Sequence, residues 1–324
     1  MLRPHRALPA LLIAAATAVL ALAGCQRDSG KQPTEGRQAM DEPAAAMSFA
    51  RSEQTWRDER RANLTKPDGW TSLIGLHWID PGAHYLGSDA DNGIRLAMGP
   101  AHLGMLDIDG KRIRFVPDKA AALTLDGQPF TAAAPLRTDV DEAGPSVIGF
   151  DDGKGLATVI ERNDRYALRV KHADAPTRTR FAGLDYWPAE PAWKIEGRFV
   201  PHEAGKTIEI ANIIGSTDQV ANPGAVEFQQ GGKTYRIEAL DEGDGELFLV
   251  FADRTNGHGS YGAGRFLYAP MPDATGRVVL DFNQSYNPPC AFTAFATCPL
   301  PPPENRLDLA ITAGEKAYRK SPHS

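Results

Sequence analysis

The sequence predicts a mainly β protein, an antiparallel sandwich or barrel-like body that follows a short N-terminal helix. Short segments that alternate apolar and polar residues recur along most of the chain, as expected for strands with one buried face. Asp-Gly pairs and other Gly-rich turns separate these segments. Few segments repeat apolar residues with the period of a helix. We therefore expect either two β subdomains that meet near residue 137 or one enlarged barrel-like sandwich.

Residues 1–24 have the features of a lipoprotein signal peptide. Two arginines precede an apolar run over residues 10–22, which is too short to span a bilayer as a helix. The run ends in Leu22-Ala23-Gly24-Cys25, which resembles the lipobox where lipoprotein signal peptidase cuts before a lipid-modified cysteine. We expect lipidation at Cys25, and an ordinary secretory signal is the alternative.

The residue after the cysteine indicates the destination. Gln26 stands where an Asp would hold a lipoprotein in the inner membrane, so the resemblance implies an outer-membrane lipoprotein that faces the periplasm. Several acyl chains on Cys25 would anchor the protein stably. The lipid would be its contact with the membrane, since no other apolar run approaches spanning length.

Charge argues against a nucleic-acid partner. Removal of residues 1–24 takes away two arginines and no acidic residue, so the formal net charge falls from −6 to −8. An acidic chain binds phosphate backbones poorly. Residues 25–47 combine Gln, Pro, Ala and charged residues without periodicity, which predicts a flexible tether.

The folded part is expected to begin at Ser48, which can cap a helix. Phe49, Ser52, Trp56 and Arg60 would share one face of this helix, which should end before Pro67. An extended segment and β-hairpins should follow and complete a subdomain over residues 48–136. The hairpins would turn at Asp109-Gly110 and Asp126-Gly127.

Two segments of this subdomain, Gly87–Leu96 and Leu125–Pro129, resemble a forkhead-associated domain. That family binds phosphothreonine through an Arg after the first Gly, and here the residue is Ser88. Without the Arg the bidentate phosphate donor is missing, so the resemblance implies the sandwich shape and not the activity.

Residues 137–324 are predicted to form a second, β-rich region. Alternating segments recur from Tyr166 to Ala252, and Arg265–Tyr268 with Arg277–Phe282 should form a further hairpin. Residues 281–306 then combine prolines with Phe and Tyr. The prolines exclude a long helix and the aromatic residues favour burial, so we expect an ordered loop that carries function.

The string Asn283–Asn305, followed by Ala313-Gly314-Glu315-Lys316, is similar to the signature of the bacterial family known as domain of unknown function 1684. Segments within 68–78 and 261–268 extend the resemblance over about residues 56–316. The resemblance implies relatives but no reaction. Independently, the lipobox uses Cys25, which leaves Cys290 and Cys298 close together in an oxidising compartment. We expect them to form a disulfide, with a reactive thiol pair as the alternative.

Polar residues in the last third of the chain predict a binding pocket for a small molecule or an envelope component within residues 253–305. The candidate ligand-binding residues are Asp253, Tyr261, Arg265, Asp281, Asn283, Tyr286, Asn287, Glu304 and Asn305. Two of their clusters flank strands that are predicted to pair, so the strand ends could converge. The alternative is that Asp and Asn cap turns while Arg265 pairs with an acid to hold a loop.

Other functions remain open. A cofactor-independent hydrolase could use Asp253, Asp281 or Glu304 as acid or base with Arg265, and a structural partner of an envelope complex is also possible. Ser260 lies in a Gly-rich loop with no helix after it, which does not fit a nucleophile elbow. Scattered histidines predict no metal site, and the lack of a phosphate loop predicts no cofactor. The aromatic cluster of Phe181, Tyr186, Trp187 and Trp193 fits a core better than a ligand surface.

Overall fold

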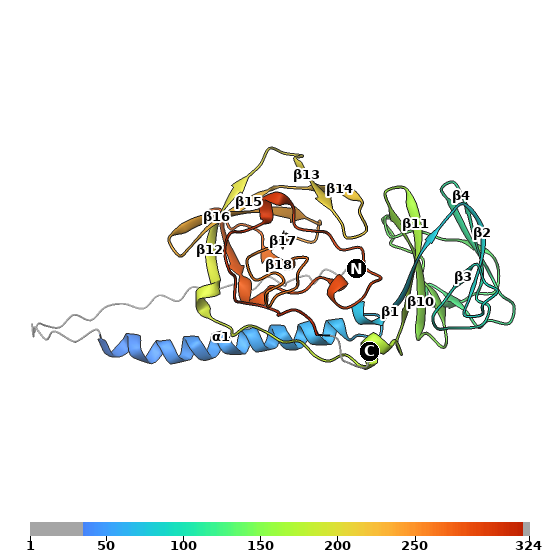
Figure 1. The fold of residues 1–324 in the computed structure, drawn as a ribbon, viewed down its shortest axis with the longest axis horizontal. Coiled ribbons are helices and arrows are strands. Elements are labelled where there is room, and N and C mark those ends of the chain that lie inside the picture. The colour runs from blue at the N-terminus through green and yellow to red at the C-terminus, as the bar shows by residue number, and fades with distance from the viewer. Residues whose placement is uncertain (1–34, 320–324) are drawn as a thin grey trace, which may run out of the picture. The chain divides into compact units, whose positions relative to one another are not determined.

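Helix α1 leads into the folded body. The computed structural model describes residues 35–319, with the backbone alone for residues 35–43. Helix α1 spans Glu35–Leu64, is blue in Figure 1, and ends before Pro67 as predicted. The predicted start at Ser48 is wrong, because residues 35–47 of the expected tether are helical. Ala, Glu, Gln and Met favour helices. Cys25 and the signal peptide lie outside the described residues.

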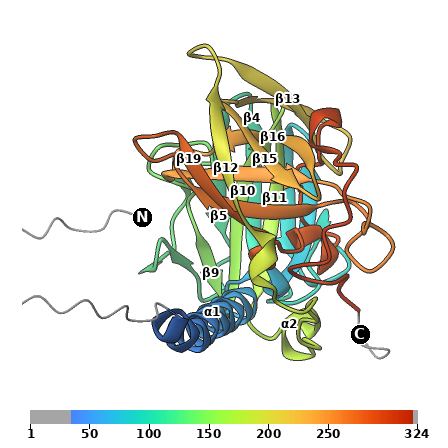
Figure 2. The same cartoon turned by 90° about the vertical axis from the view of Figure 1, so that its left-hand side faces the viewer.

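One face of α1, which Figure 2 views end-on, is buried against the body. Glu53 and Leu64 are buried, and Trp56 and Arg60 are partly buried, at the spacing of a helix face. Ser52, which was predicted on this face, is exposed. The buried face therefore carries a carboxylate and a guanidinium that need partners. Within residues 35–319 no helix is both long enough and apolar enough to cross a membrane.

Two mainly antiparallel sheets enclose the first hydrophobic core. Their strand orders are β1-β11-β10-β9-β6-β7 and β3-β2-β4-β5-β8. After η1 (Trp70–Ser72), the strands are β1 (Leu73–Ile79), β2 (Gly82–Gly87), β3 (Ile94–Arg95), β4 (Gly104–Asp109), β5 (Arg112–Pro117), β6 (Thr124–Leu125), β7 (Gln128–Pro129), β8 (Ala134–Pro135), β9 (Ile148–Phe150), β10 (Gly155–Arg162) and β11 (Arg165–His172). Leu86 and Phe115 from one sheet pack with Val159 and Leu168 from the other. This is the sandwich arrangement that the sequence predicted.

Both predicted hairpins form, but only Asp126-Gly127 occupies the two central turn positions as expected, because the first hairpin turns at Gly110 and Lys111. Asp109 lies opposite Arg112 in the β4–β5 pair, with Gly110 at a positive φ. In the β6–β7 pair, Asp126 and Gly127 have φ values of 50° and 80°. Both central residues are therefore left-handed, which suits the twist of a two-residue hairpin.

The first core extends beyond residue 137, where we expected the boundary. Strands β9, β10 and β11 follow that residue but pair with β6 and β1, so they complete the first sandwich. Its core extends to Ala175. The pairing of β1 with β11 joins distant segments and leaves no local signal in the sequence. From Ala46 onward the chain nevertheless forms one compact unit.

A six-stranded antiparallel sheet forms most of the second body, with the order β18-β17-β16-β15-β12-β19. After α2 (Pro176–Thr179) and η2 (Pro191–Trp193), the strands are β12 (Lys194–Pro201), β13 (Thr207–Ala211), β14 (Thr217–Ala221), β15 (Gly224–Gln230), β16 (Lys233–Asp241), β17 (Glu246–Phe251), β18 (Arg265–Pro270) and β19 (Arg277–Asp281). Val226, Leu249, Leu280 and Phe282 are fully buried in its core. Strands β13 and β14 form a separate hairpin.

The predicted hairpin of β18 with β19 is wrong. Strand β18 pairs with β17, and β19 pairs with β12, at opposite ends of the sheet. The sheet coils until these two edge strands lie side by side without a ladder, so it is nearly closed. The short connection between them therefore spans the seam of a barrel-like sheet.

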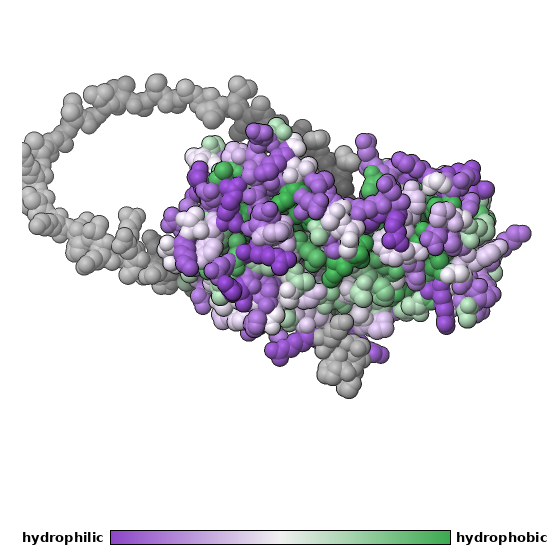
Figure 3. Space-filling view, turned by 45° about the horizontal axis from the view of Figure 1, so that its top comes forward, coloured by the Kyte–Doolittle hydropathy of each residue, from purple (hydrophilic) through white to green (hydrophobic). Residues whose placement is uncertain are grey.

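The segment after β19 has no long helix, as predicted. It contains short 3-10 turns at η3 (Phe282–Gln284), η4 (Pro289–Ala291) and η5 (Pro303–Asn305), shown in orange to red in Figure 1. The face in Figure 3 is largely hydrophilic, with apolar residues gathered near its middle.

Candidate functional site

Arg265 and Asp253 form a buried ion pair. Nη2 of Arg265 lies 2.6 Å from Oδ2 of Asp253, and both side chains have 0% exposure. Arg265 also donates to the backbone carbonyls of Ile311 and Ala313. Burial lowers the pKa of Arg265, and the charge of Asp253 opposes this shift. The ion pair therefore holds the segment around residues 311–313 in place. This is the alternative in which Arg265 pairs with an acid to hold a loop. Because both side chains are fully buried, a substrate cannot reach the ion pair.

Asn305 is also a structural residue. Strands β16 and β17 pair at Leu240 with Phe248 and at Asp241 with Leu247. Beyond this ladder Asn305 accepts from the N–H of Glu238 at 2.7 Å and donates to the carbonyls of Glu238 and Val250, both at 2.9 Å. The amide therefore satisfies backbone groups of both strands that lie outside their ladder.

Asp281 and Asn283 fix the end of β19. Asn283 exchanges hydrogen bonds with the backbone of Glu190, each at 3.0 Å. Asp281 accepts from the side chain of Asn283 and lies 3.3 Å from Nζ of Lys194. Two other candidates also lie outside any shared cavity with Arg265. Tyr261 packs on Leu64 and Phe292, and Glu304 is exposed.

Asn287 belongs to a buried network that the sequence did not reveal. Its backbone N–H donates to Oε2 of Glu315 at 2.8 Å, and its carbonyl accepts from Nη2 of Arg60 at 2.9 Å. Nε of Arg60 donates to the other oxygen of Glu315 at 2.8 Å. Glu315 has 0% exposure. This network ties α1 to two parts of the C-terminal segment and fixes the guanidinium of Arg60 in one position.

The two predicted clusters meet in space, as expected. Isolated bridges join Ala252 to Arg306 and Phe266 to Tyr286. However, the two clusters meet mainly through packing contacts between their segments. Among the candidate residues, Tyr286 is the one that lines the cleft described below.

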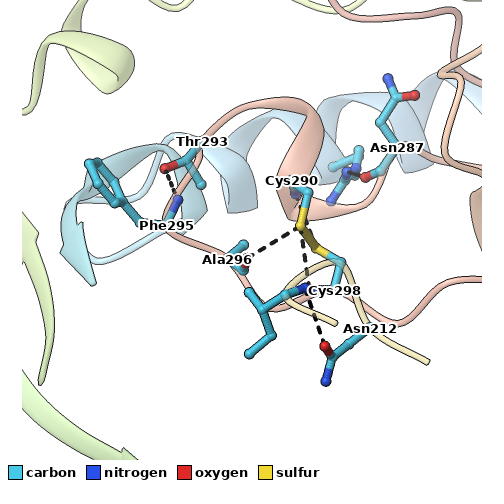
Figure 4. Close-up of a disulfide and its surroundings, with 9 residues drawn as sticks. Asn212, Asn287, Cys290, Thr293, Phe295, Ala296 and Cys298 are labelled. Atoms are coloured by element: carbon cyan, nitrogen blue, oxygen red, sulfur yellow. Dashed lines mark hydrogen bonds between the residues drawn. A yellow bond between two sulfur atoms is a disulfide. The ribbon is translucent and has the colours of Figure 1, made fainter. Parts of the chain in front are cut away.

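Cys290 and Cys298 are joined as a disulfide with their Cα atoms 6.2 Å apart, as predicted (Figure 4). The N–H of Cys290 points to Sγ of Cys298 at 3.1 Å. The carbonyl of Cys298 accepts from Ile213 at 3.0 Å, and Pro299 forms a bridge with Asn212. The loop that this bond closes, residues 290–298, is called the disulfide loop below. It is fixed both by its own bond and by contacts with the turn between β13 and β14.

A cleft of about 510 Å³ lies beside this loop. It is lined by residues of α1, of η1, of strands β10 and β11, of strands β17 and β18, and of the loops near the disulfide: Arg60, Trp70, Arg162, Arg169, Glu242, Phe248, Phe266, Tyr268, Tyr286, Pro289, Thr297, Cys298 and Pro299. Aromatic rings and arginines dominate the lining. Clefts of this size hold small organic ligands.

The tyrosines form a preorganised aromatic wall. The rings of Tyr268 and Tyr286 are stacked with their centroids 6.2 Å apart, and Phe266 meets Tyr286 edge-on at 5.8 Å. The hydroxyl of Tyr268 donates to Glu242 at 2.8 Å. Burial raises the pKa of both tyrosines well above the ordinary value. Both phenols therefore stay neutral at physiological pH.

The three arginines of the cleft differ in how their charge is compensated. Arg60 is paired with Glu315 and lies over the ring of Tyr286, 4.4 Å from its centroid. Nη1 of Arg162 lies 2.7 Å from Asp139. Arg169 makes no hydrogen bond or ion pair with any residue of the described chain, and its nearest aromatic partner is Trp70 at 5.6 Å.

Other candidates prove to be structural. Trp193 is buried and meets Phe282 edge-on, while Phe181 packs on Phe292. The core interpretation of the aromatic cluster is therefore correct for Trp193, while Phe181 packs on a smaller cluster and is partly buried. Ser260 has 1% exposure, and its hydroxyl oxygen accepts from the indole of Trp187 at 3.1 Å. A buried hydroxyl held in this way does not fit a nucleophile.

One group of possible metal ligands is found in the described chain. Asp89, Asp91 and His102 bring their ligand atoms within 4.8 Å of one another, and all three side chains are exposed. Sequence reasoning did not group them, because His102 joins the two aspartates only through the packing of β2, β3 and the loop before β4. Their exposure and mutual proximity do not by themselves define a site.

The fold and the cleft define a mainly β protein with a cleft bordered by arginines and tyrosines. Residues 179–316 match the family model described as "Protein of unknown function (DUF1684)", and the protein belongs to this family. A solved structure of an uncharacterized protein of Haloarcula marismortui is 31% identical, with a match that covers 43% of this chain and 78% of that chain at a TM-score of 0.36. No curated protein matches the chain.

Sequence reasoning missed Arg60, Arg169 and Tyr268 as parts of one site. Arg60 was assigned to a helix face, and Arg169 to an alternating strand. The available signal was local: Arg169 and Lys171 alternate with the buried Leu168 and Val170 on β11. That pattern places two cations on the face of β11 that points away from the sandwich core.

Proposed function

We propose that the protein binds a small molecule with a planar or apolar part in the cleft beside the disulfide loop. The observation that carries this proposal is the stacked pair Tyr268 and Tyr286, which borders a cleft of about 510 Å³ together with arginine side chains. Aromatic walls with a few placed polar groups are typical of ligand sites. Aromatic rings also contribute about 0.5–1.5 kcal/mol per contact beyond the area they bury.

Preorganisation supports the same proposal. Arg60 is fixed by Glu315 and Asn287 and stacks on Tyr286. The disulfide fixes the neighbouring wall at Cys298. A site whose side chains are already ordered loses less conformational entropy when it binds, so more of the contact energy appears as affinity.

The cellular setting is a separate part of the proposal. The lipobox at Cys25 and the residue Gln26 support an outer-membrane lipoprotein that faces the periplasm. In that setting the ligand would be a periplasmic small molecule or an envelope component. Intact-mass analysis of protein extracted from membranes should show an acylated Cys25 at the N-terminus.

The binding proposal is tested by removing one ring of the wall. Tyr268→Ala deletes a stacked ring and should weaken retention of a small aromatic ligand by about 2- to 10-fold, because one aromatic contact is lost. Binding is measured by titration with the neutral fluorescent dye N-phenyl-1-naphthylamine. Tyr85→Ala is the matched control, since Tyr85 is 64% exposed on β2 and lies outside this cleft.

Equal affinity of the dye for the Tyr268→Ala and Tyr85→Ala proteins would contradict the proposal, provided that both variants have the thermal unfolding midpoint of the wild type. A complete lack of dye binding to the wild-type protein would contradict it as well.

A further inference from the structure

Arg169 stands out among the cations that border the cleft. Its strand β11 places the side chain at the cleft, where it is partly buried and lies 5.6 Å from the ring of Trp70. Its Nε is buried and has no hydrogen-bond partner among the described residues. Arg60 and Arg162 are satisfied by Glu315 and Asp139. A partly buried guanidinium with no hydrogen-bonded acid is costly, so a partner supplied by a ligand would stabilise it.

We infer that Arg169 recognises an anionic group of the ligand, so that the cleft takes a small monoanion linked to a flat ring. This inference rests on the proposed binding function and adds the chemical class of the ligand. The planar fork of Arg matches carboxylate, sulfonate and phosphate oxygens in bidentate geometry.

The surrounding charges favour an anion at this point. Burial lowers the pKa of Arg169, the neighbouring charge of Arg162 lowers it further, and the charge of Asp139 opposes this shift only in part. An anion beside the guanidinium would reverse both effects. Lys171 is a second cation on the same strand, 6.0 Å from the ring of Trp70, but it donates to the backbone carbonyl of Asp68 and does not line the cleft.

The negative charge of Glu242 limits the ligand to a single negative group. Glu242 lines the cleft and accepts from Tyr268, so it places a negative charge near the aromatic wall. A ligand with a second anionic group at that end would be repelled. The ring would therefore lie on the side of Tyr268 and Tyr286, and the anion on the side of Arg169.

Two dyes with the same ring system separate the ring contact from the charge contact. 8-Anilinonaphthalene-1-sulfonate carries a sulfonate, and N-phenyl-1-naphthylamine is its neutral counterpart. The wild-type protein should bind the sulfonate dye more tightly than the neutral dye. Arg169→Gln should weaken the sulfonate dye by roughly tenfold and leave the neutral dye unchanged, because a charge-assisted hydrogen bond is lost.

Arg165→Gln is the matched control. It removes the same charge from the same strand, but Arg165 is exposed, stacks on Trp78 and does not line this cleft. Dye bound by acyl chains at the N-terminus is common to all variants and cancels in the comparison. If Arg169→Gln does not fold, Arg169→Met keeps the packed stem of the side chain and has the same expected result.

The outcomes are distinct. Loss of sulfonate-dye affinity in Arg169→Gln that does not exceed the loss in Arg165→Gln overturns the inference, even where Tyr268→Ala weakens both dyes and the binding function stands. Absence of binding of either dye to the wild-type protein overturns the binding function itself. A selective tenfold loss for the sulfonate dye supports the assignment of Arg169.

Discussion

At the scale of single residues, burial decides what most of the predicted ligand-binding side chains do. Arg265 and Asn305 have 0% exposure and bond to backbone groups of neighbouring segments. Their residue types are those of a binding site, but their surroundings are those of a core. Tyr286 and Arg169 differ because part of each side chain faces the cleft.

Glu53 shows how a single buried carboxyl should affect stability. It has 2% exposure, accepts from Gln284 at 3.1 Å, and its Oε2 has no partner in the described chain. Burial raises its pKa, and the charge of Asp281 raises it further. The folded state therefore binds a proton more tightly than the unfolded chain, where the pKa is about 4.3.

The sign of the pH dependence follows from this shift. The stabilising contribution of protonated Glu53 is present below the unfolded pKa and is lost as pH rises through the raised folded pKa. Glu53→Gln should therefore have a flatter stability profile and a higher free energy of unfolding than the wild type at pH 7. Urea unfolding from pH 4 to pH 8 measures this. Glu59→Gln, exposed on the same helix, should follow the wild type, and a parallel profile for Glu53→Gln would refute the assignment.

At the scale of elements, the disulfide loop has little regular secondary structure to stabilise it. It lacks a strand ladder, and Cys290 and Cys298 are eight positions apart. Closing a loop of about nine residues should stabilise the fold by ~2.6 kcal/mol on the chain-entropy model. Since Cys298 and Pro299 border the cleft, the same bond also holds one of its walls.

Cys290→Ser should lower the free energy of unfolding by about that amount, because the unfolded chain gains the freedom of an open loop. Denaturant unfolding under oxidising conditions provides the measurement. Reduction should destabilise the wild type to the same extent and leave Cys290→Ser unaffected. Two free thiols at residues 290 and 298 in the oxidised, denatured wild-type protein would show that no disulfide forms.

At the scale of the whole molecule, the sequence predicted what local rules determine. The hairpin turns at Gly110 and at Asp126-Gly127 follow from residues that accept a positive φ. The disulfide followed from proximity in sequence. The pairing of β1 with β11 could not be predicted, because no local signal links two strands that lie so far apart in the sequence.

The site was less predictable than the fold for the same reason. Arg60 and Glu315 are 255 positions apart, and Trp70 and Arg169 meet through the β1–β11 pairing. Polar residues close together in sequence pointed to residues 253–305, yet Arg265 and Asp253 neutralise each other inside the body. The cleft draws its cations from the first 170 residues and its tyrosines from the last 60.

The central claim is that this cleft binds a small anionic molecule with a ring. A crystal structure of the protein with 8-anilinonaphthalene-1-sulfonate tests it most directly. We expect the sulfonate within hydrogen-bonding distance of the guanidinium of Arg169 and the rings against Tyr268 or Tyr286. Dye bound elsewhere, such as in the cleft lined by Tyr85 and His102, with this cleft left empty, would contradict the claim.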